Sequence, residues 1–429
     1  MQDHQAFNKR LARFLDASPT PFHAVSEMSR RLADTGFIAL EEGGVWNLKP
    51  GGKYFVSRNG SSLIAFVMGA NDIAQSGIRM VGAHTDSPCL MIKPQPEISN
   101  KGYFQLGVEV YGGALLNPWF DRDLSIAGRI VFNDESGSLR QKLVNFDQPV
   151  ALIPSLAIHL DREANKNRSI NAQKDIPPIL MQSHGKENFR DMLAVHFCPG
   201  GSKVLDYELC LYDVQGAATL GMNQEFFASA RLDNLLSCFV GMQALMEADG
   251  ENTSLLVCND HEEVGSVSAI GADGPFLESV VNRICDGATN KALDRSLLIS
   301  CDNAHAVHPN FSDRHDVNHM PALNGGPVIK VNVKQRYATT GVTASIFRQL
   351  CVEHDVPVQT FVSRSDLECG STIGPITSAR LGVPTLDVGL PQLAMHSCRE
   401  VTGVKDPVRL ATVLQAFLNR PGNIAVEFE

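Results

Sequence analysis

The sequence lacks the features that would assign it to a membrane, a nucleic acid or a secretory pathway. No stretch of its 429 residues has the length and purity of a transmembrane helix, and the polar start, residues 1–6, has no signal-peptide core. The formal net charge is −10, and no basic run is interleaved with aromatic residues, which argues against a nucleic-acid platform. We therefore expect a cytoplasmic protein with no membrane or nucleic-acid partner.

The sequence also lacks the motifs of two common enzyme classes. Without a G-x-S-x-G motif a serine hydrolase is disfavoured, and without G-x-x-x-x-G-K-[ST] or G-x-G-x-x-G a nucleotide enzyme is disfavoured. None of the ten cysteines forms C-x-x-C, and several lie in apolar runs, as Cys238 and Cys258 do. This distribution is typical of reduced, buried thiols. Cys301 precedes an aspartate, but neighbouring strand residues point to opposite faces, so we expect no zinc thiolate there.

The most informative segment is 255–265, where an apolar run gives way to four consecutive ionisable residues, Asp260, His261, Glu262 and Glu263. Strands of a buried parallel sheet read as apolar runs, and their carboxyl ends are where open α/β sheets hold ligands. Two adjacent glutamates at such a place predict a division of labour. One would bind a metal while the other transfers protons, as a metal hydrolase requires.

Matching ligand types stand at other predicted strand and helix ends. The candidates are His84 and Asp302 after apolar runs, Asp233 before a helical pattern at 235–246, and His396 after a short apolar run. With Glu263 they make two histidines and three carboxylates. Such ligands suit zinc, manganese or cobalt, and five of them suffice for two metals that share one carboxylate.

Three further histidines have plainer interpretations. Alternation along an extended strand would turn His261 away from Glu262, so we expect a structural role for it. His315 and His319 have the i, i+4 spacing of a helical zinc pair, but no glutamate follows His315 directly. We therefore expect that segment to be a loop.

The chain is predicted to contain two domains, one inserted into the other. With 44% hydrophobic and 20% charged residues it has a globular composition, and it is too long for a typical single domain. Residues 1–94 and 228–429 show helical periodicity and buried-strand patterns, which predict one α/β domain. Residues 95–227, beyond the break at Lys93-Pro-Gln-Pro96, show short alternating segments that predict a β-rich insertion.

At this point the residues carry a family resemblance. The motifs are GAHTDS at 82–87, ARLDN at 230–234, NDHEEVG at 259–265, GPVIKVN at 326–332, CGSTIGP at 369–375 and PQLAMHS at 391–397. With all six in this order, the chain resembles the M18 aminopeptidases, the aspartyl aminopeptidase group of dinuclear metallopeptidases, over nearly its whole length. The resemblance implies an α/β fold. A dinuclear zinc-peptidase domain with a mixed central sheet flanked by helices would carry an inserted β-rich dimerisation domain.

The resemblance also implies a metal-ligand set. Asp233 would bridge two divalent metal ions, most simply zinc, with cobalt or manganese as alternatives. His84 and Asp302 would complete one metal site, and Glu263 and His396 would complete the other.

Further residues receive roles by the same resemblance. Glu262 would be the general base that deprotonates a metal-bridging water, and Asp86 would fix the geometry around the site. His159 would contact substrate in a neighbouring subunit, with a metal-ligand role as the alternative. His305 and Lys330 match positions associated with the substrate pocket.

The implied activity is that of a hydrolase, a metal-dependent aminopeptidase acting on peptides with a free N-terminus, with a preference for Asp or Glu as the first residue. A preference for neutral residues is the alternative, as is a related co-catalytic metal carboxypeptidase or deacylase. A non-catalytic scaffold is the alternative from a different class. The implied assembly is a dimer built by the insertion and, from dimers, a tetrahedral dodecamer; a monomer with a β-rich lid is the other interpretation of the insertion.

Overall fold

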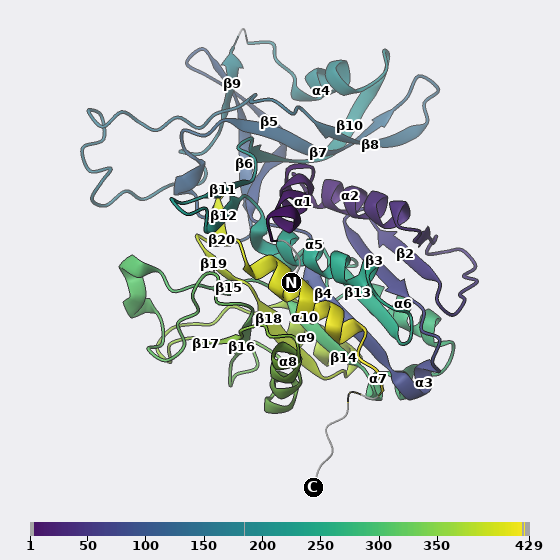
Figure 1. The fold of residues 1–429 in the computed structure, drawn as a ribbon. Coiled ribbons are helices and arrows are strands. Elements are labelled where there is room, and N and C mark those ends of the chain that lie inside the picture. The colour runs from purple at the N-terminus through teal and green to yellow at the C-terminus, as the bar shows by residue number, and fades with distance from the viewer. Residues whose placement is uncertain (1–3, 184, 423, 425–429) are drawn as a thin grey trace. The chain divides into compact units, whose positions relative to one another are not determined.

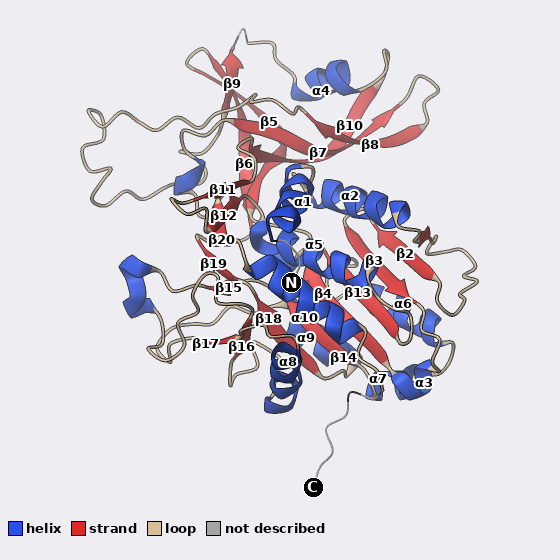
Figure 2. Ribbon diagram, viewed as in Figure 1, coloured by secondary structure: helices blue, strands red, loops and turns tan. Residues whose placement is uncertain are grey.

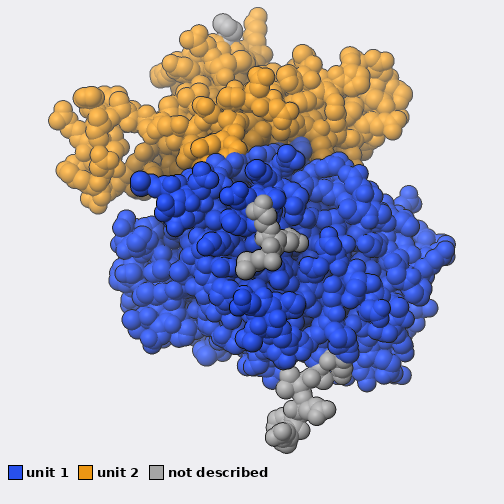
Figure 3. Space-filling view, viewed as in Figure 1, with its two compact units in different colours: residues 1–86, 217–395, 400–429 blue, residues 87–216, 396–399 orange. Residues whose placement is uncertain are grey.

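The computed structural model describes residues 4–183, 185–422 and 424 as two compact units (Figure 3). The first unit comprises residues 1–86, 217–395 and 400–429, and the second comprises residues 87–216 and 396–399. Within the described residues, no helix is long and apolar enough to cross a membrane. The ten cysteines, all of them described, are free thiols, as expected.

A mixed sheet forms the centre of the first unit (Figure 2). Its strands, as far as the chain is described, run in the order β1-β2-β3-β13-β4-β14-β18-β16-β17. Their bounds are β1 Ile38–Ala39, β2 Lys53–Arg58, β3 Ser62–Val67, β4 Ile78–His84, β13 Thr253–Asn259, β14 Leu297–Cys301, β16 Val328–Val331, β17 Gln359–Val362 and β18 Thr385–Gly389. The central strands β13, β4, β14 and β18 are parallel neighbours. They are buried along their whole length, which explains their continuous apolar sequences.

Helices cover both faces of this sheet (Figures 1 and 2). One core cluster joins the sheet to α1 His4–Asp16, α2 Pro21–Asp34, α5 Leu232–Met246, α8 Gly341–Glu353 and α10 Asp406–Leu418. A second cluster joins the opposite face to α6 Phe276–Cys285 and α7 Thr289–Asp294. The remaining helical segments of this unit are α3 Ile73–Ser76, α9 Ile373–Leu381, η2 Glu262–Val264 and η3 Pro309–Arg314.

Local sequence explains where these helices begin. At α2 the Thr20 side chain accepts a hydrogen bond from the backbone N–H of His23 at 3.4 Å, and Pro21 occupies the first turn. At α8 the side chains of Thr340 and Thr343 cap each other's backbone N–H groups. Such caps satisfy backbone donors that no helical carbonyl can reach, so each helix starts at a defined residue.

A smaller sheet in the first unit has the strand order β11-β12-β20-β19-β15 among the described residues. The bounds are β11 Ala218–Leu220, β12 Phe226–Ser229, β15 Ala304–His305, β19 Pro391–Leu393 and β20 Glu400–Gly403. Strand β12 leads directly towards Asp233, and β15 follows directly after Asp302. The sheet therefore anchors two segments that carry predicted metal ligands.

The second unit is built on an antiparallel sheet with the described order β8-β7-β10-β5-β6-β9. Its elements are β5 Cys89–Asn100, β6 Tyr103–Tyr111, η1 Asn117–Trp119, β7 Leu124–Asn133, β8 Leu139–Asn145, β9 Ile179–Gln182, α4 Phe189–Phe197 and β10 Lys203–Asp213. A separate apolar cluster, including Phe104, Ile130 and Leu209, forms its core. The alternating segments of the sequence correspond to these strands.

The division between the units differs from the predicted boundaries at 94 and 227. Pro94 and Pro96 lie inside β5, where the pairing with β6 shifts register between Ile92 and Glu97. Prolines are tolerated at such irregularities because a bulge leaves backbone positions without ladder bonds. These prolines therefore interrupt one strand's pairing and do not end a domain.

Candidate metal centre

The centre lies where three neighbouring strands of the first unit end. Strands β4 and β13 are parallel, with His84 directly opposite Asn259, and β14 pairs in parallel with β4 on its other side. The residues that follow β13 and β14 are therefore brought beside His84. Parallel register thus converts three sequence-distant strand ends into one cluster of polar side chains.

His84 stands at the middle of the cluster and is 1% exposed. Its Nδ1 lies 3.1 Å from the carbonyl oxygen of Asp86, so Nδ1 donates there. Its Nε2 lies 3.4 Å from Asp233 Oδ1, 3.8 Å from Asp302 Oδ1 and 3.9 Å from Glu262 Oε2. This leaves Nε2 as the ring atom that faces the carboxylates, the arrangement of a metal-binding histidine.

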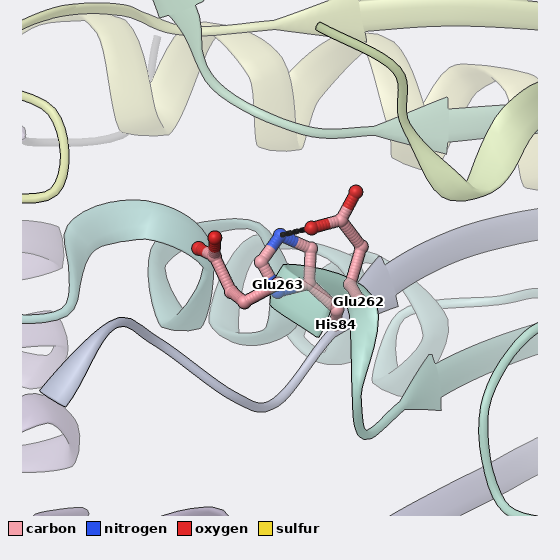
Figure 4. Close-up of side chains that lie close together, drawn as sticks. All are labelled: His84, Glu262 and Glu263. Carbon is pink, nitrogen blue, oxygen red and sulfur yellow. Dashed lines mark ion pairs between the residues drawn. The ribbon is translucent and has the colours of Figure 1, made fainter. Parts of the chain in front are cut away.

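Glu262 and Glu263 approach the imidazole from a short turn, η2 (Figure 4). Asp86, which is fully buried, accepts the backbone N–H groups of both residues at 3.1 Å. The turn follows His261 in the left-handed conformation, with φ 66°, so this segment is not the extended strand that was predicted. The His261 ring lies 2.9 Å from Ser268 Oγ. A turn held by one carboxylate is what directs both glutamates towards His84.

Asp233 enters from the irregular first turn of α5, where its ψ is 104° and so not helical. Its backbone N–H donates to the Oε2 of Glu400 at 3.0 Å, and both residues are almost fully buried. Glu400 belongs to β20 of the smaller sheet. That sheet therefore fixes the backbone of Asp233 from outside the helix.

Asp302 follows β14 and lies between Lys330 and His84. Its Oδ2 lies 3.2 Å from Nζ of Lys330, which also donates to the carbonyl oxygen of Asn303 at 3.2 Å. Burial alone would raise the pKa of Asp302, but Lys330 and His84 hold that pKa well below its ordinary value. Lys330 is 2% exposed, so its ammonium group contacts Asp302 and is shielded from solvent.

The pKa values of the other groups show how crowded the cluster is. Burial disfavours the imidazolium of His84, yet the surrounding carboxyl groups outweigh burial and raise its pKa well above the ordinary value. Desolvation raises the pKa of Glu262 to about 8 against the opposing charge of His84. Desolvation and the charge of Asp233 raise the pKa of Glu263 well above its ordinary value. Positive charge at the centre would relieve both of these carboxyl groups.

The donor set fits divalent transition metals. Among the described residues of the first unit, two groups of possible ligands have their ligand atoms within 4.8 Å of one another, namely His84 with Asp233 and Asp302, and His84 with Glu262 and Glu263. Imidazole and carboxylate donors of this kind suit zinc. Buried carboxylates in this number need compensating cations. Lys330 provides one positive charge, and a metal centre would provide the rest.

A cavity of about 310 Å³ lies in the same unit. It is lined by a predicted substrate residue, His305, and by four further cationic or titratable residues, His308, His315, Arg314 and Arg364. Among the described residues lining it, Glu368 is the one acid. Arg364 is partly neutralised by Asp366, whose carboxylate lies 2.7 Å away. The cavity wall therefore favours an anionic group.

The remaining predicted residues belong to the second unit or to loops of the first. His159 is exposed in a turn of the second unit, and His396 stands in the 396–399 segment of that unit. The His396 Nδ1 lies 3.1 Å from the carbonyl oxygen of Gly113, so Nδ1 donates there. His315 and His319 lie in a loop, as predicted, with His319 Nδ1 2.6 Å from Asp316.

Three supporting residues escaped the sequence analysis. Glu400 fixes Asp233, while Asn234 and Asn303 flank metal-ligand candidates and donate to backbone carbonyls. The two asparagines stand directly beside the predicted aspartates, which was a signal in the sequence. Glu400 had no such signal, because its role depends on the pairing of β20 with β12.

The sheet, with a buried imidazole and carboxylates at the carboxyl ends of its parallel strands, defines a metallohydrolase of the α/β class. The chain matches the family model for "Aminopeptidase I zinc metalloprotease (M18)" over residues 14–418. The protein therefore belongs to the M18 family of zinc aminopeptidases, which remove N-terminal residues from peptides.

Relatives support this membership. The chain is 56% identical over 416 residues to a probable M18 family aminopeptidase 2 of Ectopseudomonas mendocina, covering 95% of this chain and 97% of the relative. A cryo-EM structure of an Ape4 and Nbr1 complex matches with a TM-score of 0.92 and 38% identity, covering 97% of this chain and 86% of that one. The mApe1 dodecamer of S. cerevisiae matches with a TM-score of 0.83 and 28% identity, covering 95% of each chain.

Proposed function

We propose that this aminopeptidase uses two divalent metal ions, most simply zinc, with Glu262 as its general base, and that it prefers an acidic first residue. The observation that carries the proposal is the convergence of Asp233, Asp302 and Glu262 on the Nε2 of one buried histidine, His84. Cobalt or manganese would satisfy the same donors.

Five residues would hold the two ions. His84 and Asp302 would serve one, Glu263 and His396 the other, and Asp233 would be shared between them. The Nδ1 contact of His396 with a backbone carbonyl supports its ligand role, because metal-binding histidines commonly donate their other ring N–H in this way. Asp233 suits the shared position because its backbone is fixed by Glu400.

The chain's own residues would then perform the proton transfers. When bound, the cations supply Lewis acidity, which polarises the scissile carbonyl and makes water more acidic. Glu262 accepts the proton from the attacking water and returns it to the leaving amine. Desolvation raises the pKa of Glu262 to about 8, so this buried carboxyl group holds a proton readily. Asp86 keeps Glu262 in place through the backbone of η2.

The acidic preference rests on the cavity. Arg314 and Arg364 would place positive charge near the side chain of the first substrate residue, and His305 lies in the same cavity wall. The sequence-based role for Lys330 differs from this, since in the structure its ammonium group contacts Asp302. A preference for neutral residues is the competing proposal.

A substrate panel with metal reconstitution tests this function. Metal-free protein would be loaded with zinc, cobalt or manganese, and cleavage of Asp-, Glu-, Leu- and Ala-chromophore substrates would be compared. We expect no activity without metal, up to two ions per chain by elemental analysis, and a higher kcat/KM for Asp and Glu. Faster cleavage of the neutral substrates would exclude the acidic preference, and full activity in metal-free protein would exclude the mechanism.

We also propose that the second unit builds dimers and a dodecamer, and that His159 contacts substrate in a neighbouring subunit. The exposed position of His159 and the dodecamer of the yeast relative support this. His159→Ala should lower turnover without changing metal content. Mixed assemblies of His159→Ala and Glu262→Gln chains should regain activity, and absence of recovery would exclude a shared site. Loss of one metal from His159→Ala would support the ligand role instead.

A further inference from the structure

Two buried asparagines connect the segments that carry Asp233 and Asp302, and they do so reciprocally. Asn234, which follows Asp233, donates from Nδ2 to the carbonyl oxygen of Cys301 at 2.8 Å. Asn303, which follows Asp302, donates from Nδ2 to the carbonyl oxygen of Leu232 at 2.9 Å. Each amide therefore reaches from the residue after one aspartate to the residue before the other.

The burial of the pair makes these bonds consequential. Asn234 is 0% exposed and Asn303 is 4% exposed, so water cannot replace either donor. The two carbonyls also lie at the ends of their elements. Leu232 opens α5, whose next two residues are not helical, and Cys301 is the last residue of β14. The amides supply hydrogen bonds at the two points where regular structure stops.

The pair is also tied to the rest of the centre. Asn303 Nδ2 contacts the Oε1 of Gln392, in β19, as well as the Leu232 carbonyl. The backbone carbonyl oxygen of Asn303 accepts a hydrogen bond from Lys330, whose ammonium group also contacts Asp302. Movement of Asn303 would therefore disturb the ammonium–carboxylate contact at Asp302.

We propose that Asn234 and Asn303 form a reciprocal clamp that sets the spacing between Asp233 and Asp302 and so holds both as ligands of one cation. The proposal rests on the two-metal function above. The asparagines are positioning residues, since they touch neither substrate nor reacting atoms. Because each bond ties the same two segments, either substitution alone should weaken the same cation site.

The test measures metal binding as well as turnover. Metal-free Asn234→Ala and Asn303→Ala proteins would be titrated with Zn²⁺ against a competing chelator, and with Co²⁺ by visible absorption. Outer partners of metal ligands typically contribute about 10- to 100-fold in affinity. We expect a loss of that size at one site in both variants, with the same change in the Co²⁺ spectrum.

Asn8→Ala is the matched control. Asn8 is 5% exposed and donates from Nδ2 to the carbonyl of Val404 at 2.8 Å, away from the centre. The Asn8→Ala substitution removes an equivalent buried hydrogen bond. It should therefore lower the melting temperature of the metal-free protein and leave both metal affinities unchanged. If Asn8→Ala weakens metal binding equally, or if the clamp variants bind metal like the parent, the clamp is excluded.

If an alanine variant does not fold, as judged by circular dichroism of the metal-free protein, the serine variants Asn234→Ser and Asn303→Ser replace it. They retain a shorter donor and should lose affinity to a smaller degree; unchanged affinity in folded serine variants, with normal Co²⁺ spectra, would overturn the clamp. If the parent protein binds no metal, the proposed function fails, and the clamp fails with it.

Discussion

The two ends of β4 bury charge in different ways. At its carboxyl end, His84 faces several ionisable side chains. Near its amino end, Arg79 is 0% exposed, and its guanidinium donates to the backbone carbonyls of Ser76, Arg420 and Gly422. Burial lowers the pKa of both groups. At His84 the surrounding carboxyl groups outweigh burial and raise the pKa, whereas at Arg79 burial and the charge of Arg420 lower the pKa to about 10.

The difference distinguishes a reactive site from a structural one. Carbonyl oxygens accept from Nη1 and Nη2 of Arg79, and these fixed dipoles hold a segment in place without a titratable acceptor. Carboxyl groups around His84 compete for protons and cations, so that end can bind metal and transfer protons. Burial of a charge alone is therefore a poor guide to function, while the kind of partner is a good one.

The largest expected effect comes from removing the proposed base at the reactive end. Glu262→Gln keeps the size of the side chain but cannot accept a proton from water. We expect kcat to fall by about 10²–10⁴-fold, with two metals retained and the circular dichroism spectrum unchanged. Steady-state assays on a substrate with an N-terminal Asp measure kcat, and elemental analysis measures the metal content.

Glu263→Gln is the matched comparison, because Glu263 is the next residue on the same turn and shares the contact with Asp86. It should lose one metal as well as activity. If Glu262→Gln cleaves at the parent rate, or if the two variants lose metal to the same extent, their roles have been exchanged or misassigned.

A smaller effect is expected from Lys330→Met, which removes the ammonium group beside Asp302 but keeps an unbranched side chain. Without Lys330 the pKa of Asp302 rises, so protons compete with metal at higher pH. We expect zinc affinity to fall about 10- to 100-fold, and the acid limb of metal occupancy to move to higher pH.

Titration of zinc into the metal-free variant between pH 5 and pH 8, roughly the range in which such shifts are resolved, measures this movement. The opposite result is equally informative. If metal binding is unchanged while KM rises for acidic substrates alone, Lys330 contacts substrate, as the sequence resemblance implied.

Much of this architecture could be predicted from sequence, because buried parallel strands leave continuous apolar runs. The apolar run before Asp260 is strand β13, and the helical pattern predicted at 235–246 lies within α5. Strand ends then located the ionisable residues. The turn geometry at His261 was missed, since a left-handed residue other than glycine has no strong sequence signal.

Long-range pairing explains the other omissions. Glu400 and Asp233 are far apart in sequence, and only the ladder between β12 and β20 brings them together. The prolines of β5 suggested a break, because a single sequence does not show that a bulge absorbs them. Side-chain partners between distant segments depend on register, which local patterns leave open.

The smallest expected effect on activity is at the other end of β4. Arg79→Met removes the guanidinium, so the carbonyls of Ser76, Arg420 and Gly422 lose a donor, at about 1–3 kcal/mol for a buried group left unsatisfied. Removing a buried charge offsets part of that loss. We expect the free energy of unfolding to fall by no more than about 1–3 kcal/mol, with kcat and metal content unchanged. Denaturant titration and metal analysis of the same sample measure both quantities. A tenfold loss of kcat in a folded, fully metallated Arg79→Met protein would show that the two ends of β4 are coupled, and the contrast between structural and reactive charge would then fail.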